Sequence, residues 1–197
     1  MISKLGRIIN HSIRIKKKLI KLEKNVYKAI ELISTTLKNG NKVLICGNGG
    51  SAADAQHLAT EFLIRLRPNV NRRSFPVISL AQDASTITAC GNDLGFNNLF
   101  KRNFEGLANK DDLLIAISTS GNSKNILNVL KSAKYRKVNS ISFLGNNGGK
   151  CKGLSNLDII VQEKNTARIQ ECHIFLGHFI FEEVENSLIN SKYKIKN

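Results

Sequence analysis

The spacing of hydrophobic and polar positions predicts a chain in which helices and strands alternate. From Ile2 to Leu37 apolar residues recur every three or four positions, and Asn39-Gly40 ends this pattern, which indicates one broken helix or two consecutive helices. Further along the chain, short apolar runs alternate with stretches of helical spacing. The predicted strands are 42–46, 75–80, 113–117, 140–144 and 157–161, and the predicted helices between them are 51–66, 86–90, 98–107 and 123–135.

This alternation is typical of an α/β fold with a parallel sheet. We expect a three-layer sandwich in which helices cover both faces of a central parallel sheet of about five strands. A single domain, residues 1–197, is predicted, with an N-terminal helical segment over 1–38 and a long C-terminal helix over 167–189. In such a sheet, ligands bind at the carboxyl ends of the strands.

Two loops rich in glycine and serine follow predicted strands and lead into predicted helices. They are Gly47-Asn48-Gly49-Gly50-Ser51 and Ser118-Thr119-Ser120-Gly121-Asn122-Ser123. Glycine lets backbone N–H groups turn toward a ligand, hydroxyls add donors, and the start of a helix carries partial positive charge. Neither loop has the spacing of a dinucleotide or nucleoside triphosphate motif. The duplication therefore predicts a phosphorylated small molecule as the ligand.

Composition and charge narrow the class of protein. Thirty Lys and Arg residues against fifteen Asp and Glu residues give a net charge of +15, which by itself favours nucleic acid as a partner. However, Lys16-Lys17-Lys18 is the one tight basic run and no aromatic residues are interleaved with it, so we favour solvated helix faces and expect no nucleic-acid partner. No apolar run approaches the roughly 20 residues of a membrane span, and the cysteines form no C-x-x-C pair. We expect a cytoplasmic protein with reduced thiols and no membrane partner.

Side chains able to do chemistry occur in two places. His57 and Glu61 are four positions apart on one predicted helix, so both project from the same face, one turn apart. Such a pair can hold a divalent metal, although it is more often a surface contact. The second group is Gln170, His173 and His178 on the final helix. Gln170 and His178 are separated by about 12 Å along the helix axis, so both reach one ion only with extended side chains.

Five motifs stand in one order along most of the chain. They are Cys46-Gly-Asn-Gly-Gly-Ser51, Ala55-Gln-His57 with Glu61, Gly91-Asn-Asp93, Ser118-Thr-Ser-Gly-Asn-Ser123, and Arg168-Ile-Gln-Glu171 with His178. In order and spacing they resemble the phosphoheptose isomerases of the sugar isomerase (SIS) domain family. The chain departs from some of these relatives at Ala167, where they carry an acidic residue.

The resemblance implies the flavodoxin-like SIS fold and an enzyme of heptose biosynthesis. The implied activity is an aldose–ketose isomerase that converts sedoheptulose 7-phosphate to D-glycero-D-manno-heptose 7-phosphate, the first step toward ADP- or GDP-heptose and the lipopolysaccharide core. The implied zinc ligands are His57, Glu61, Gln170 and His178. The implied substrate contacts are Asn48, Gly49, Gly50, Ser51, Asn92, Asp93, Ser118, Thr119, Ser120, Ser123 and Gln170. A homotetramer with sites between subunits is also implied.

The reaction assigns roles to two of these residues. An aldose–ketose interchange moves a proton between C1 and C2, which needs a base and a donor that stabilises the enediolate oxygens. Glu61 is the candidate base and His178 the candidate acid. For Asp93, a helix or turn cap explains the residue about as well as substrate binding does. His173 is expected to form a hydrogen bond within a subunit interface.

Two alternatives remain at this point. Arginines in and next to the basic loop Pro68–Arg73 could assist in phosphate binding, namely Arg65, Arg67, Arg72 and Arg73, but for most of them we favour a solvated basic loop. The strongest rival function is that of a non-catalytic SIS paralogue that binds the replication initiator protein. That paralogue lacks the carboxylate and the histidine that match Glu61 and His178, so the enzyme is favoured.

Overall fold

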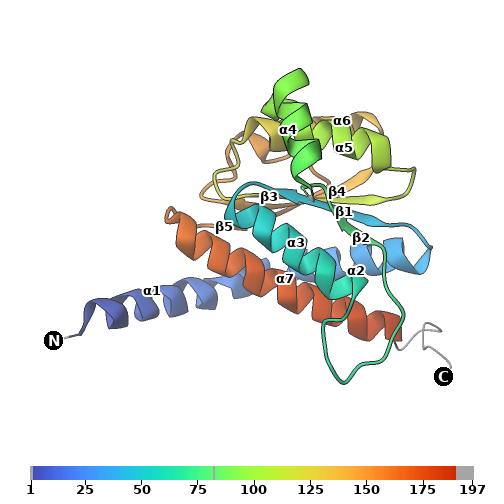
Figure 1. Cartoon of the computed structure of the whole chain (residues 1–197). Helices are drawn as coiled ribbons and strands as arrows, with labels where there is room; N and C mark the ends of the chain where they lie inside the picture. Colours follow the sequence, from blue (N-terminus) through green and yellow to red (C-terminus); the bar gives the residue numbers. More distant parts are fainter. Residues whose placement is uncertain (1, 82, 190–197) are drawn as a thin grey trace.

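Five short strands form a parallel sheet at the centre of the computed structural model, which describes residues 2–81 and 83–189 (Figure 1). They are β1 (Val43–Gly47), β2 (Val77–Ser79), β3 (Leu113–Ser118), β4 (Asn139–Gly145) and β5 (Leu157–Val161), in the order β2-β1-β3-β4-β5. β1 and β3 are buried along their whole length, which is why they read as continuous apolar runs. They are neighbours in the sheet, so the two loops that follow them leave it side by side.

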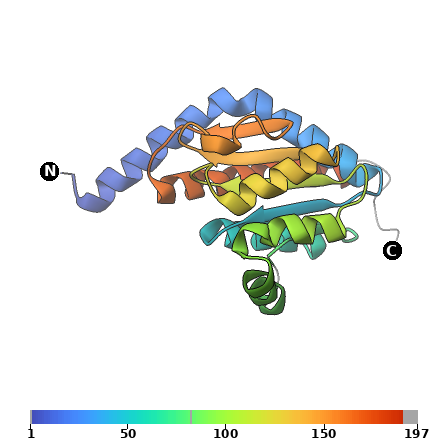
Figure 2. The same ribbon diagram turned by 90° about the horizontal axis from the view of Figure 1, so that it is seen from above.

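Helices cover both faces of this sheet, as Figures 1 and 2 show. They are α1 (Lys4–Lys18), α2 (Glu23–Lys38), α3 (Gly50–Leu63), α4 (Ala84–Asp93), α5 (Leu99–Leu107), α6 (Lys124–Tyr135) and α7 (Thr166–Ile189), with 3₁₀ turns η1 (Leu19–Leu22), η2 (Phe96–Asn98) and η3 (Gly149–Cys151). Side chains of β1 alternate between two cores. Val43 and Ile45 pack with α2, α3 and α7, whereas Leu44 and Cys46 pack with α5 and α6. The predicted three-layer α/β fold is confirmed.

The local differences from prediction have clear causes. α3 starts at Gly50 rather than Ser51, because Gly49 makes the turn with a φ of 55°. β2 is shorter than predicted, because Phe75 bonds through its N–H to the end of α3 instead of pairing with β1. α4 continues to Asp93 where a turn was expected after Cys90, so the Gly91-Asn92-Asp93 motif is helical.

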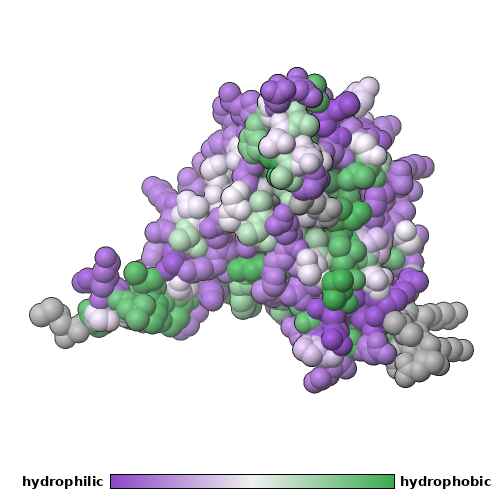
Figure 3. All heavy atoms as spheres, in the orientation of Figure 1, coloured by the Kyte–Doolittle hydropathy of each residue, from purple (hydrophilic) through white to green (hydrophobic). Residues whose placement is uncertain are grey.

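The N-terminal helix α1 reaches beyond the body of the molecule (Figures 1 and 2). Ile9 and Ile13 are about half exposed and Leu5 is 66% exposed, and Figure 3 shows hydrophobic atoms gathered on this projecting part. The second half of α1 is held by His11, whose Nε2 lies 3.0 Å from Oε2 of Glu163. α1 therefore offers an apolar surface that this chain does not bury by itself. Among the described helices, none combines the length and the apolar character that crossing a membrane requires.

Candidate active site

The loop after β1 is joined directly to the helix that follows β3. Asn48 and Asn125, at the start of α6, exchange two side-chain hydrogen bonds of 2.9 and 2.8 Å. Gly50 packs against the side chain of Gln170 on α7, and a Cβ at this position would collide with it. The first loop thus contacts both α6 and α7. Polar groups that can bind a ligand therefore come together from this loop and from the two helices, at the carboxyl end of β1.

The loop after β3 closes on itself and leaves the start of α6 open. Oγ of Ser118 accepts a hydrogen bond from the Gly121 N–H and lies 3.3 Å from Oγ of Ser123. Oγ of Ser120 accepts from the Asn122 N–H. Ser123 makes no side-chain cap on α6, whose first turn contains no acidic residue. The Ile126 N–H already donates to Oδ1 of Asn125, but Ser123 leaves the N–H groups before it uncapped, and with the helix dipole they suit an anion such as a phosphate.

The pair His57 and Glu61 on α3 meets His178 on α7. Nε2 of His57 lies 2.8 Å from Nε2 of His178 and 3.3 Å from Oε1 of Glu61. The nitrogen and oxygen atoms of the three side chains all lie within 4.8 Å of one another. We refer to these three residues as the His–Glu cluster. Gln170 stands two turns before His178 on the same helix, against Gly50.

A partly buried carboxylate stands next to this cluster. Asp54 is one turn before His57 on α3, and its Oδ2 atom is buried without a hydrogen-bond partner among the described residues. Burial raises the pKa of Asp54, while the charges of His57 and His178 lower it. Two imidazole nitrogens with a carboxylate oxygen are a donor set that zinc accepts, and unpartnered negative charge beside them favours a cation. The residues present therefore fit a divalent metal.

Sequence reasoning missed Asp54, although a signal was present. Asp54, His57 and Glu61 follow the three- and four-residue spacing of one helix face. Only the position of His178 on α7 shows that this face meets a second imidazole, in a cluster that stays open to solvent because His57 and His178 are exposed.

Asn92 and Asp93 are not brought to the His–Glu cluster within one chain. Both are exposed at the end of α4, where Nδ2 of Asn92 donates a 2.7 Å hydrogen bond to Oδ1 of Asp93. α4 lies on the opposite side of the sheet from α3 and α7 (Figure 1). In the part of the chain that the structure describes, no hydrogen bond or ion pair joins Asn92 or Asp93 to another candidate site residue.

His173 does not lie where the sequence suggested. Instead of an interface it occupies the interior, where its Nε2 donates a 3.1 Å hydrogen bond to the Leu144 carbonyl on β4. Burial lowers the pKa of His173 to about 4. The residue is therefore a neutral part of the core, and the expected subunit-interface role is wrong.

The basic segment after α3 also differs from its interpretation as a solvated loop. Arg72 is buried and its Nε lies 2.6 Å from Oε1 of Glu185 on α7. Arg67, just before this segment, donates from Nε to the other oxygen of Glu185 at 2.7 Å. The interpretation is wrong for Arg72, because a buried acidic partner far along the chain neutralises it.

Known proteins share both the sequence and the fold. The SIS domain family profile matches residues 8–145. A phosphoheptose isomerase of Aliarcobacter butzleri is 46% identical over 184 residues, which cover 93% of this chain and 96% of that protein. The solved phosphoheptose isomerase of Neisseria gonorrhoeae is 37% identical with a TM-score of 0.85, and that of Francisella tularensis is 33% identical with a TM-score of 0.88.

Each of these two structural matches covers 93% of this chain and 97% of the solved one. Identity at this level over nearly whole chains shows that the protein belongs to the SIS domain family and, within it, to the phosphoheptose isomerases.

Proposed function

We propose that this protein isomerises sedoheptulose 7-phosphate to D-glycero-D-manno-heptose 7-phosphate, the first step of ADP- or GDP-heptose biosynthesis. The observation that carries this proposal is the meeting of His57, Glu61 and His178 within 4.8 Å, from two helices far apart in sequence. A carboxylate and an imidazole at this distance are the acid and base that an enediolate mechanism needs. The non-catalytic paralogue is not favoured, because both groups are present and all the relatives described above are isomerases.

In this mechanism Glu61 acts on the carbon atoms C1 and C2, and His178 acts on their oxygen atoms. The Glu61 carboxylate removes a proton from C1 of the ketose, which gives an enediolate, and returns the proton to C2. His178 donates a proton to the C2 oxygen and then accepts the proton of the C1 oxygen as the aldehyde forms, which restores its starting state. Because both side chains lie beside His57 in one small cluster, they are already close enough to act on neighbouring carbons of one sugar.

The loop after β3 is proposed to hold the phosphate at the far end of the sugar. Its support is the open start of α6 together with the hydroxyls of Ser118, Thr119, Ser120 and Ser123. Asn48, Gly49, Gly50 and Ser51 of the first loop, with Gln170, are proposed to contact the sugar hydroxyls, since backbone N–H groups and amides suit neutral polar groups. The interloop bond from Asn48 to Asn125 fixes the distance between the two contacts.

Zinc is the proposed metal, held by His57, Glu61, Gln170 and His178. The donor set of the cluster and the unpartnered oxygen of Asp54 support a bound cation. A zinc ion bound there would supply a Lewis acid for the carbonyl of the sugar. Elemental analysis should find about one zinc per site, and treatment with a chelator should abolish activity that added zinc restores. A fully active, metal-free enzyme would contradict this assignment.

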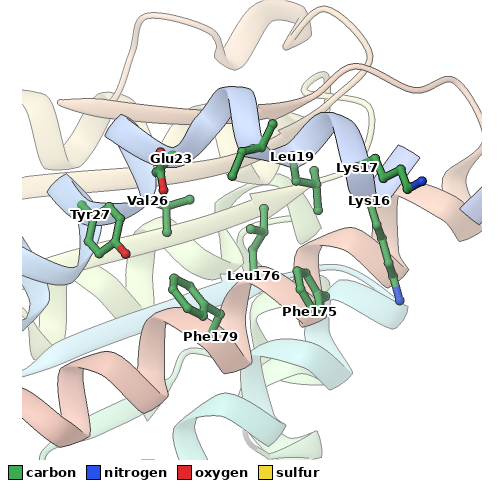
Figure 4. A pocket seen from close by; sticks show the side chains of 10 residues that line it. Lys16, Lys17, Leu19, Glu23, Val26, Tyr27, Phe175, Leu176 and Phe179 are labelled. Carbon is green, nitrogen blue, oxygen red and sulfur yellow. The ribbon is translucent and has the colours of Figure 1, made fainter. Parts of the chain in front are cut away.

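A homotetramer with sites shared between subunits is proposed as the working form. The exposed stripe of α1 is one supporting surface. A second is the apolar groove between η1, α2 and α7 in Figure 4, lined by Leu19, Ile20, Val26, Tyr27, Phe175, Leu176 and Phe179. Shared sites also account for Asn92 and Asp93, which one chain keeps across the sheet from the cluster. Light scattering that finds a monomer at assay concentration would contradict this arrangement.

The cytoplasm is the proposed compartment, because all four cysteines are free and buried, as expected of reduced thiols. There the product would supply heptose for the lipopolysaccharide core or another heptose-containing glycan.

The direct test of the function is to incubate the purified full chain with sedoheptulose 7-phosphate. We expect heptose 7-phosphate to appear, followed by ion-exchange chromatography and by NMR of the anomeric proton. Fructose 6-phosphate is the matched control, because it offers the same reacting carbons on a shorter chain. Absence of turnover with zinc present would contradict the proposed function.

A further inference from the structure

The long segment that joins α3 to β2 (Figure 1) carries an arginine whose side chain is almost fully buried. The Arg72 side chain is 1% exposed, and its Nε donates a 2.6 Å hydrogen bond to Oε1 of Glu185, whose side chain is 0% exposed. The guanidinium carbon lies 4.7 Å from the centre of the Phe75 ring and 5.6 Å from that of Phe62. Contacts on its edge and on its faces fix the orientation of this planar cation.

The same side chain caps the end of α3. Nη2 of Arg72 donates to the Glu61 carbonyl at 2.7 Å, and Nη1 donates to the Phe62 carbonyl at 2.9 Å. Because α3 ends at Leu63, both carbonyls belong to its last turn, where C=O groups have no partner within the helix. Glu61, the proposed base, therefore stands in a turn whose main chain is held by Arg72.

Glu185 connects this cap to α7. It follows His178 by seven residues, which is two helical turns, so the two side chains project from the same side of α7. Its second carboxylate oxygen accepts the 2.7 Å hydrogen bond from Arg67. One buried pair thus links the turn that carries Glu61 to the helix that carries His178.

We propose that Arg72 and Glu185 are positioning residues that set the distance between the α3 and α7 members of the His–Glu cluster. This inference rests on the proposed metal-dependent isomerase. Stability alone gives no reason for the pair, because apolar side chains of similar size often replace a buried ion pair without loss. What the pair supplies is a fixed orientation, since one rigid guanidinium bonds the Glu61 and Phe62 carbonyls at the end of α3, the Arg73 carbonyl and one carboxylate at once. Misplacement of a reacting group by about 1 Å is enough to lower a rate about a hundredfold.

The decisive variant replaces both charges in the full chain, Arg72→Met with Glu185→Met. No buried charge is left unpaired, so we expect a wild-type circular dichroism spectrum and cooperative unfolding. The affinity for Co²⁺, measured by competition with a chromophoric chelator, should fall tenfold to a hundredfold, roughly the effect of losing groups that orient metal ligands. The visible absorption of bound Co²⁺ should change, and kcat should fall while KM stays constant.

The matched control is Lys42→Met with Asp112→Asn. It removes a partly buried ion pair, 2.6 Å long, which stands just before β1 and β3 and thus at the opposite end of these strands from the loops. Co²⁺ affinity and kcat should remain at the wild-type level in this control, whatever happens to its stability. Wild-type values in the folded Arg72 and Glu185 variant would overturn the proposal.

Two further outcomes are decisive as well. If the double variant does not fold, Arg72→Lys replaces it, because lysine keeps the charge but cannot bond both carbonyls and the carboxylate together. Reduced Co²⁺ affinity in the folded Arg72→Lys protein supports the proposal, and unchanged affinity overturns it. A wild-type protein that binds no Co²⁺ contradicts the metal site rather than the pair, and the comparison of kcat between variant and control then decides.

Discussion

The His–Glu cluster and the loop after β3 are both needed for the proposed reaction, but they are held in place in different ways. The loop closes mainly through bonds between residues two to five positions apart, such as Ser118 with Gly121 and Ser120 with Asn122. Two more bonds come from η3, where the Lys150 N–H donates to Oδ1 of Asn122 and the Cys151 N–H donates to the Gly121 carbonyl. The cluster joins side chains 121 positions apart, and it exists only because α3 packs against α7. Mostly local bonds therefore hold the proposed phosphate site, with support from η3, whereas the proposed catalytic site depends entirely on a tertiary contact.

This difference predicts a division of effects. Loop substitutions should alter substrate binding and little else, because main-chain donors contact the phosphate equally in the ground state and in the transition state. Substitutions in the cluster should alter turnover, because proton transfer depends on titratable side chains at fixed positions. Distant residues that hold α3 against α7 should resemble the cluster in their effects and not the loop.

Glu61→Gln is expected to show the largest effect of a cluster substitution on turnover. Glutamine keeps the shape of the side chain but cannot take up a proton, so kcat should fall about a thousandfold while KM changes only a few-fold. Steady-state assays with sedoheptulose 7-phosphate measure both constants, and metal content is determined on the same samples. The matched control is Glu182→Gln, an exposed carboxylate on α7 that should behave like wild type. Wild-type turnover of Glu61→Gln would remove Glu61 as the base.

How much the sequence could predict follows the same division. The glycines and hydroxyls of the two loops are local signals, and buried parallel strands are visible as apolar runs. The pair His57 and Glu61 was accessible from helical spacing. The sequence could not say which face of the last helix meets this pair, because His173 and His178 are about 140° apart around the axis and either could have pointed to it. Packing of α7 against β4 decides this by burying His173.

Arg72 shows why the rest was out of reach. In sequence it stands among proline, asparagine and other arginines, a composition that favours a solvated loop. Its partner Glu185 follows 113 positions later, and no local pattern links the two. Burial of a charge depends on a partner that only the folded chain supplies. Periodicity and composition therefore could not predict that Arg72 is buried.

His173→Gln changes a core residue of α7 that lies outside the His–Glu cluster, so it separates the effects of α7 on stability from those on turnover. The pKa of His173 is about 4 in the folded protein, below its usual 6.5. As pH falls below about 6.5, the unfolded chain binds a proton that the folded protein does not take up until about pH 4, so the free energy of unfolding decreases. Between pH 7.5 and pH 5 this loss should be about 2 kcal/mol and should be absent from the variant.

Urea unfolding at pH 7.5, 6 and 5 measures this difference in slope. Glutamine can still donate to the Leu144 carbonyl, so activity at pH 7.5 should stay close to wild type in spite of the nearby His178. Parallel stability curves for the two proteins would contradict a buried neutral histidine. A loss of turnover would instead contradict the separation of core and cluster along α7.

Ser120→Ala tests the loop, with the smallest expected effect. Ser120 is exposed and its Oγ accepts one bond from the Asn122 N–H, which water can replace, so the loop should keep its shape. Loss of one hydroxyl donor to a charged phosphate should raise KM about tenfold, or about 1.4 kcal/mol, with kcat nearly constant. Ser187→Ala, in the last turn of α7, is the matched control. A fall in kcat with constant KM would contradict the proposed division, because it would mean that this local loop positions the reacting carbons and not only the phosphate.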